Sequence, residues 1–182
     1  MKIRNKSLLY LILSAELLIC GCTKQPIDQL PPMTHTGANT FGCLLNGKAW
    51  IPSLSGGGLI WPTGGGFFGD AGGRTNIYIE ANSENDYFEI YLKHITRVGT
   101  YPLNAATYVK PYDIFPESYG AYFLLGVRDY YVTTPIYNGT VVITYADSVQ
   151  GIVAGTFEMK LYRQGTNEVL NITGGRFDYK NH

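Results

Sequence analysis

Thr40-Phe-Gly-Cys-Leu-Leu-Asn-Gly-Lys-Ala-Trp-Ile51 is the stretch that decides the fold. Phe41, Cys43 and Leu45 alternate along it and would share one face of an extended chain. Asn46-Gly47 then supplies the two positive φ angles that a type I′ turn requires, after which the chain returns through Trp50. The stretch therefore predicts a β-hairpin.

The same alternation continues to the end of the chain. Ile77 to Ala81 and Tyr87 to Ile95 flank the turn Asn82 to Asp86. Five further runs follow, separated by turns rich in Gly, Asn and Asp: Tyr119 to Val127, Tyr130 to Tyr137, Thr140 to Tyr145, Gly151 to Tyr162 and Val169 to Tyr179, with Gly174-Gly175 interpreted as one more turn. No stretch after the leader has apolar residues at helical spacing over the length of a stable helix. The sequence thus predicts an all-β domain over residues 40–182, with about nine strands in a single antiparallel β-sandwich or, alternatively, a small closed, lipocalin-like β-barrel.

The first 22 residues predict export and lipidation. Lys2, Arg4 and Lys6 precede an apolar run from Leu8 to Ile19, which is too short to cross a bilayer because a helix needs about 20 apolar residues to do so. Ile19-Cys-Gly-Cys22 fits a lipobox: a branched apolar residue, a small residue, and a cysteine that accepts a diacylglyceryl thioether. We expect residues 1–21 to be a lipoprotein signal peptide, Cys22 to be lipidated, and the Pro-containing residues 22–39 to be a tether that holds the domain off the membrane.

The composition of the chain limits which partners it can bind and which metal or thiol chemistry it can support. From Cys22 onward there are eleven basic and thirteen acidic residues, a net charge of about −2, which argues against nucleic acid. Once Cys22 is acylated, Cys43 is the one remaining thiol, so we expect no disulfide and a buried, apolar role for Cys43. His35, His94 and His182 lack metal-ligand spacing, and the sequence predicts neither a metal site nor a cofactor.

Tyrosines around a Pro-containing loop form the first candidate ligand surface. Tyr108, Tyr112, Tyr119 and Tyr122 offer flat, amphipathic rings that suit a sugar or a protein. Tyrosine also packs well in sheets, so ordinary covering of a strand surface remains the alternative.

A Gly-rich segment is the second candidate. Pro52 to Arg74 contains nine glycines together with Trp61, Phe67 and Phe68. A loop of this length either contacts a ligand through these aromatic rings or places them as a cap over an open end of the core.

Catalytic signals are weak. Asp113 and Glu117 lie in one predicted loop and could form the carboxylate pair of a glycan-active hydrolase, although their spacing is not specific. His94 lies near a strand end, and no Gly-x-Ser-x-Gly motif accompanies it. The sequence therefore favours a protein that is not an enzyme.

Four motifs carry a resemblance to a known family: Thr40 to Pro52, Gly99-Thr-Tyr-Pro-Leu-Asn104, Gly155-Thr-Phe-Glu158 and Ile172-Thr-Gly-Gly-Arg-Phe-Asp178. Together they resemble a family of uncharacterised lipoproteins typical of Bacteroidetes, a domain of unknown function. The resemblance implies an acylated all-β envelope protein and assigns no activity. In such bacteria an Asp-Ser-apolar tripeptide can be O-glycosylated, which implies Ser148 as an acceptor. Because no acidic export signal follows Cys22, an outer-membrane location facing the periplasm is preferred to the cell surface.

The functional prediction is a lipid-anchored, non-enzymatic binding or structural module of the cell envelope. Its expected partners are the membrane, through the lipid anchor, and a glycan or an envelope protein. The alternatives are a hydrolase that uses Asp113 and Glu117, and a lipocalin-like carrier of a small ligand in a hollow apolar interior.

Overall fold

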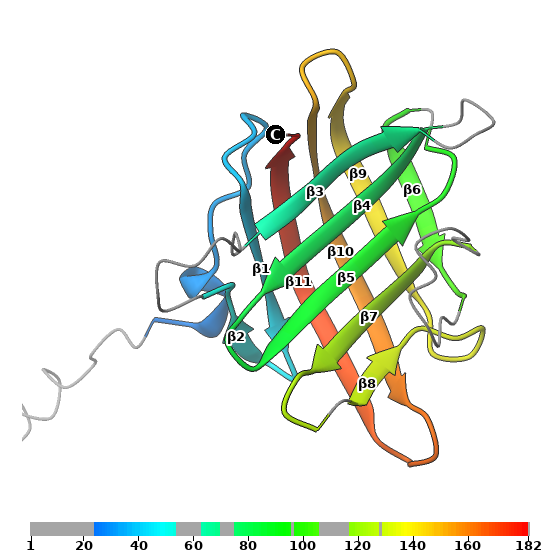
Figure 1. The fold of residues 1–182 in the computed structure, drawn as a ribbon. Helices are drawn as coiled ribbons and strands as arrows, with labels where there is room; N and C mark the ends of the chain where they lie inside the picture. Colours follow the sequence, from blue (N-terminus) through cyan, green and yellow to red (C-terminus); the bar gives the residue numbers. More distant parts are fainter. Residues whose placement is uncertain are drawn as a thin grey trace, which may run out of the picture.

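The computed structural model describes residues 24–53, 63–69, 75–95, 97–105, 117–127 and 129–181. Across these ranges the chain forms one sheet of eleven strands, preceded by the 3-10 turn η1 (Pro26–Gln29). Figure 1 shows the strands with their labels. No helix in the described ranges is long and apolar enough to cross a membrane. The prediction of an all-β, antiparallel domain is confirmed.

Nine of the strands correspond to the runs expected from sequence, and β3 and β6 are additional. The strands are β1 (Thr40–Leu45), β2 (Lys48–Trp50), β3 (Thr63–Gly69), β4 (Thr75–Asn82), β5 (Asp86–Leu92), β6 (Gly99–Leu103), β7 (Tyr119–Leu124), β8 (Asp129–Val132), β9 (Gly139–Asp147), β10 (Ile152–Arg163) and β11 (Val169–Lys180).

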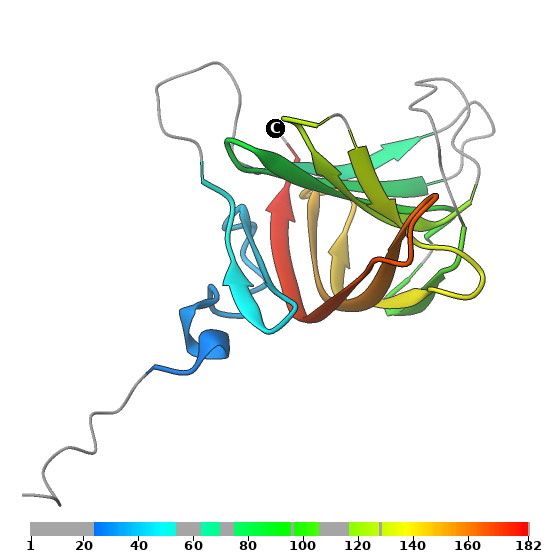
Figure 2. The same ribbon diagram turned by 90° about the horizontal axis from the view of Figure 1, so that it is seen from below.

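The sheet forks at β10 and folds over itself. Its main path runs β2-β1-β11-β10-β8-β7-β5-β4-β3, while β10 also pairs with β9, which in turn pairs with β6. One layer therefore contains β1, β2, β6, β9, β10 and β11, and the other contains β3, β4, β5, β7 and β8. Figure 1 shows the second layer crossing in front of the first, and Figure 2 shows the sheet curling into a half-barrel.

The core lies between the layers and is aromatic. The Phe41 ring centroid is 5.1 Å from that of Phe157 and 5.7 Å from that of Phe88, so rings from both layers meet. Cys43 is fully buried beside them as a free thiol, and burial raises its pKa. The apolar role expected for Cys43 is confirmed.

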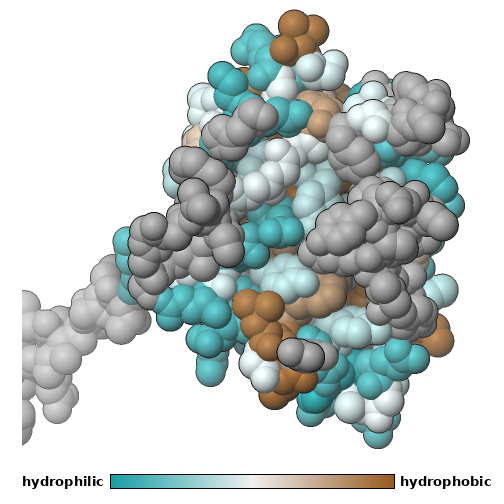
Figure 3. Space-filling view, in the orientation of Figure 1, coloured by the Kyte–Doolittle hydropathy of each residue, from teal (hydrophilic) through white to brown (hydrophobic). Residues whose placement is uncertain are grey.

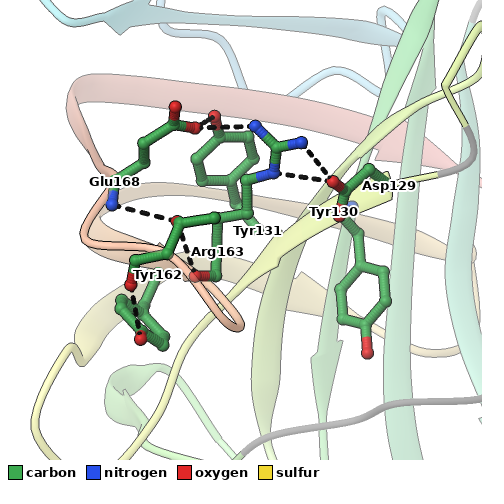
Figure 4. Close-up of polar contacts among 7 residues, drawn as sticks. Asp129, Tyr130, Tyr131, Tyr162, Arg163 and Glu168 are labelled. Carbon is green, nitrogen blue, oxygen red and sulfur yellow. Dashed lines mark hydrogen bonds and ion pairs between the residues drawn. The ribbon is translucent and has the colours of Figure 1, made fainter.

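The seam between the layers is short and is reinforced by one arginine. Strands β8 and β10 share two register pairs, Tyr162 with Val132 and Arg163 with Tyr131. Arg163 Nε donates to Asp129 Oδ2 at 2.6 Å, and Arg163 Nη1 donates to Glu168 Oε2 at 2.9 Å (Figure 4). The Tyr131 hydroxyl donates to the same Glu168 oxygen at 2.7 Å. This group ties β8 to β10 and to the turn that follows β10.

The Gly-rich segment is not a loop throughout, which corrects the interpretation of Pro52 to Arg74. Residues Thr63–Gly69 form β3, paired along its length with β4. A Cβ at Gly65, where φ is +146°, would lie 2.3 Å from the Tyr78 carbonyl oxygen, so glycine is what lets the two backbones approach. The side chain of Asn181 covers the free edge of β3: its Oδ1 accepts from the Phe67 N–H at 2.9 Å, and its Nδ2 donates to the Phe67 carbonyl at 2.8 Å.

Gly174-Gly175 is also not a turn. Both residues lie inside β11, where the register with β10 shifts between Phe157 and Met159 and marks a β-bulge. Gly174 has φ of +59°, and Gly175 lies against the Phe157 ring, where a Cβ would come within 2.5 Å. The prediction of a turn at this place was wrong because a bulge and a turn have the same glycine signature.

Residues 30–39 are packed on the domain, contrary to the expectation of a tether over residues 22–39. Leu30 is buried, and Arg176 Nη1 donates to the Pro31 carbonyl at 3.2 Å. The Asp178 carboxylate accepts hydrogen bonds from the Thr34 hydroxyl at 2.6 Å and from the Gly37 N–H at 2.8 Å. We call residues 30–39 the strap, because they run over the outer face of β11 and are fixed there.

Candidate functional site

Three aromatic side chains line up across the second layer. Tyr87 of β5 is directly opposite Phe123 of β7, which is opposite Tyr130 of β8. Their chain neighbours Phe88, Tyr122 and Tyr131 lie in the core cluster. Because successive side chains of a strand point to opposite faces, Tyr87, Phe123 and Tyr130 lie on the outer face. We call these three residues the aromatic ladder.

The rings of the aromatic ladder are in mutual contact and reach the surface. Tyr87 and Phe123 are stacked, with centroids 4.5 Å apart and planes at 7°. Phe123 and Tyr130 follow at 5.7 Å and 33°. All three side chains are half-buried, so part of each ring remains open to solvent. Tyr87 and Phe123 therefore cover one another's facing ring surfaces, and the ladder is a preformed row of stacked rings.

Apolar residues continue the strip at the end of the β7–β8 hairpin. Leu125 and Val127 are 51% and 67% exposed. Figure 3 shows a brown patch over this hairpin on a face that is otherwise mostly teal and white. Clusters of exposed apolar side chains commonly mark binding surfaces in soluble proteins.

A buried network of hydroxyls and carboxylates adjoins the ladder on the same face. The Tyr78 hydroxyl lies 2.6 Å from Glu80 Oε2 and 2.9 Å from Glu89 Oε1, and the Tyr119 hydroxyl donates to Glu89 Oε2 at 3.2 Å. Glu89 is 0% exposed. Burial, followed by the charge of Glu89, raises the pKa of both tyrosines, so both remain donors at neutral pH. The network holds β4, β5 and β7 together beneath the surface.

The structure describes two of the four tyrosines that the sequence predicts as a ligand surface. Tyr119 and Tyr122 are described and lie in the interior, Tyr119 bonded to Glu89 and Tyr122 packed 4.7 Å from Phe88. Tyr122 points between the two layers, whereas Tyr119 shares the face of Phe123 but is buried in a second cluster with Tyr91, Ala121 and Val132, against which Phe123 and Tyr130 pack. Tyr108 and Tyr112 lie outside the described residues.

The aromatic residues of the Gly-rich segment are partly described. Phe67 packs against the main core, which agrees with the capping alternative. For Phe68 the backbone lies in β3 and its side chain is outside the description, as is the whole of Trp61.

One member of the candidate catalytic pair, Glu117, is among the described residues. Glu117 is exposed and accepts from Lys93 Nζ at 2.6 Å in a surface ion pair. Asp113 and the lipidation candidate Cys22 are outside the described residues. In the part of the chain that the structure describes, no three His, Cys, Asp or Glu residues are grouped to hold a metal ion.

Ser148 occupies the exposed turn between β9 and β10. The carboxylate of Asp147 shapes this turn, since its Oδ1 accepts from the N–H groups of Val149 and Gln150 at 2.9 Å each. The hydroxyl of Ser148 is thus on an accessible surface, while its O-glycosylation stays a prediction.

The aromatic ladder was missed in the sequence analysis, although a signal was present. Outward positions of strands in a soluble sheet are usually polar, and Tyr87, Phe123 and Tyr130 each alternate with a core residue. Three aromatic residues in outward positions of three strands would have indicated the surface, but their alignment depends on strand register.

Comparison with protein families identifies the domain. A family described as a domain of unknown function (DUF6252) matches residues 70–179, more than half of the chain. The chain belongs to this family. The DUF6252 match covers β4 through β10 and nearly all of β11, and therefore includes the aromatic ladder. Neither a curated protein nor a solved structure matches the chain.

Proposed function

We propose that this DUF6252 protein is a lipid-anchored, non-enzymatic module of the cell envelope that binds a glycan on its aromatic ladder. The leader and lipobox that end at Cys22 support the anchor. The resemblance to Bacteroidetes lipoproteins supports an outer-membrane location, with the domain facing the periplasm. The observation that carries the binding proposal is the stacked, half-exposed strip of Tyr87, Phe123 and Tyr130.

A glycan suits the strip for a physical reason. Sugar rings have apolar C–H faces that pack on the exposed parts of aromatic rings, and their hydroxyls need polar partners beside them. Neighbouring strands are about 4.8 Å apart, so the three rings extend over about 10 Å, which suits an extended oligosaccharide. Tyr87 and Tyr130 add phenolic hydroxyls along this strip.

An envelope protein is the second candidate partner. The exposed Leu125 and Val127 beside the ladder favour it, since apolar anchors next to aromatic rings are typical of protein interfaces. The carrier alternative gains no support from the described interior, which is filled by packed rings such as Phe41, Phe157 and Phe177. The hydrolase alternative gains none from Glu117, whose carboxylate is paired with Lys93.

Binding to polysaccharides tests the proposal. The full mature protein is mixed with peptidoglycan sacculi, xylan and mannan, and bound protein is measured by co-sedimentation. We expect one of these polymers to retain the protein and Phe123→Ala to weaken retention about tenfold, because about 1.4 kcal/mol of ring contact corresponds to that factor.

Tyr137→Ala is the matched control. Tyr137 stacks on Tyr162 with centroids 5.0 Å apart and planes at 6°, so the control removes an equally stacked ring away from the ladder. Equal retention of the wild type, Phe123→Ala and Tyr137→Ala would contradict the ladder as the site. Failure of all three polymers, together with capture of an envelope protein that Phe123→Ala abolishes, would replace the glycan with a protein partner.

A further inference from the structure

The docked strap fixes where the chain leaves the domain. Leu30 is buried, and η1 precedes it directly at one side of the molecule. Figures 1 and 2 both show η1 beside the β1–β2 hairpin and the connection between β8 and β9 on the opposite side. The exit point of the chain is therefore defined relative to the whole fold.

The chain between Cys22 and η1 is short. Four residue steps separate Cys22 from Pro26, and even a fully extended chain spans at most about 14 Å over that distance. A domain of about 140 residues has a radius of gyration of about 14 Å and hence a width of about 35 Å. The reach is less than half of that width, so the segment is too short to lead around the domain to its far side.

We call the side of the domain that carries η1 and the β1–β2 hairpin the η1 side. Its side chains are compatible with a bilayer surface. Ile51, at the end of the adjoining hairpin, is 44% exposed, and Ile27 is 37% exposed although the tip of its side chain lies close to Gly174 of β11. Lys24, which shortly precedes η1, and Lys48, the first residue of β2, are also exposed. Apolar side chains and lysines together are what a monolayer interface accepts.

We infer that the η1 side, with Ile27 and Ile51, lies against the phospholipid bilayer that holds the protein's own acyl anchor, so that the domain has one fixed orientation on the membrane. This inference rests on the lipid anchor of the proposed function. The strap fixes this orientation, because residues 30–39 are bound to the domain and add nothing to the length of the free tether. The side that carries Ile136, which is 82% exposed, then faces away from the bilayer.

Spin-label relaxation measures the orientation. Nitroxides are attached at Ile27→Cys and, as the matched control, at Ile136→Cys in the acylated full mature protein. The protein is reconstituted in vesicles of phosphatidylethanolamine and phosphatidylglycerol that contain a nickel-chelating lipid. Cys43 is buried and does not compete for the label. We expect relaxation by surface nickel to be several-fold stronger at position 27 than at position 136.

A variant with a longer tether is the second part of the experiment. Inserting about 20 Gly and Ser residues between Thr23 and Pro26 adds a mean span of about 25 Å, which should remove most of the difference between the two positions. Equal relaxation at both positions in protein whose Cys22 is shown by mass to be acylated would overturn the orientation and leave the anchor standing. An unacylated Cys22 would overturn the anchor and the orientation with it.

Discussion

Asp178 shows how one side chain fixes a segment from the other end of the chain. Its carboxylate is 1% exposed and accepts from Thr34, Thr36 and Gly37 of the strap. Burial raises the pKa of this carboxyl, but the hydrogen bonds from Thr34 and from the backbone of the strap outweigh burial and hold the pKa below its usual value of 3.8. The ionised form is therefore the one that the folded strap stabilises.

The lowered pKa predicts the pH dependence of stability. A carboxyl whose folded pKa is depressed contributes stability above its unfolded pKa, and that contribution is lost as pH falls through the folded pKa. At pH 7 we expect Asp178→Asn to lower the free energy of unfolding by about 2 kcal/mol, because asparagine loses the charge and turns an NH2 group toward a donor of the strap in place of one acceptor oxygen. Urea titrations from pH 7 down to pH 2 should show the gap between wild type and variant closing below pH 3.8.

Asp147→Asn is the control at the residue scale. Asp147 also accepts two backbone N–H groups, but it lies in the turn that carries the exposed Ser148, and asparagine retains an acceptor oxygen there. Its unfolding free energy should stay within about 0.5 kcal/mol of wild type, as for most surface substitutions. A constant difference between wild type and Asp178→Asn at every pH would contradict the role given to the charge.

At the scale of elements, nine strands followed from apolar alternation, and two did not. β3 is largely glycine and has no side-chain period, so its pairing depends on the approach of Gly65 to Tyr78 and on Asn181, which lies 114 residues from Phe67 in sequence. β6 carries Pro102, which lacks an N–H and argues against a strand unless the strand is at an edge. Both strands form through contacts with residues distant in sequence, which the pattern of neighbouring residues cannot predict.

The edge of β3 can be tested through Asn181. Asn181→Ala removes both side-chain hydrogen bonds to the Phe67 backbone, and each such bond contributes about 0.5–1.5 kcal/mol. Because the site is exposed, we expect a loss of about 1 kcal/mol of local stability, seen as roughly fivefold faster hydrogen exchange of the Phe67 amide.

Asn171→Ala serves as the control for Asn181→Ala, since Asn171 is an exposed asparagine on β11 whose backbone pairing does not depend on its side chain. Exchange at Phe67 should then stay at the wild-type rate. Unchanged exchange in Asn181→Ala as well would show that the edge is protected by other contacts.

At the scale of the whole molecule, strands far apart in sequence form one curled sheet whose outer face carries the aromatic ladder. The alternation in each strand predicted which residues face the core, such as Phe88 and Ile90. It did not predict that Tyr87, Phe123 and Tyr130 would align, because register is set between strands. Nor did it predict the strap, whose bonds to Asp178 connect residues more than 140 positions apart.

We propose above all that this domain is held at the envelope membrane through Cys22. Mass spectrometry of the mature amino-terminal peptide from the native organism measures this most directly. We expect the mature chain to begin at Cys22 and to carry a diacylglyceryl thioether with an added amide-linked acyl chain. A mature chain that begins elsewhere, or an unmodified Cys22, would contradict it.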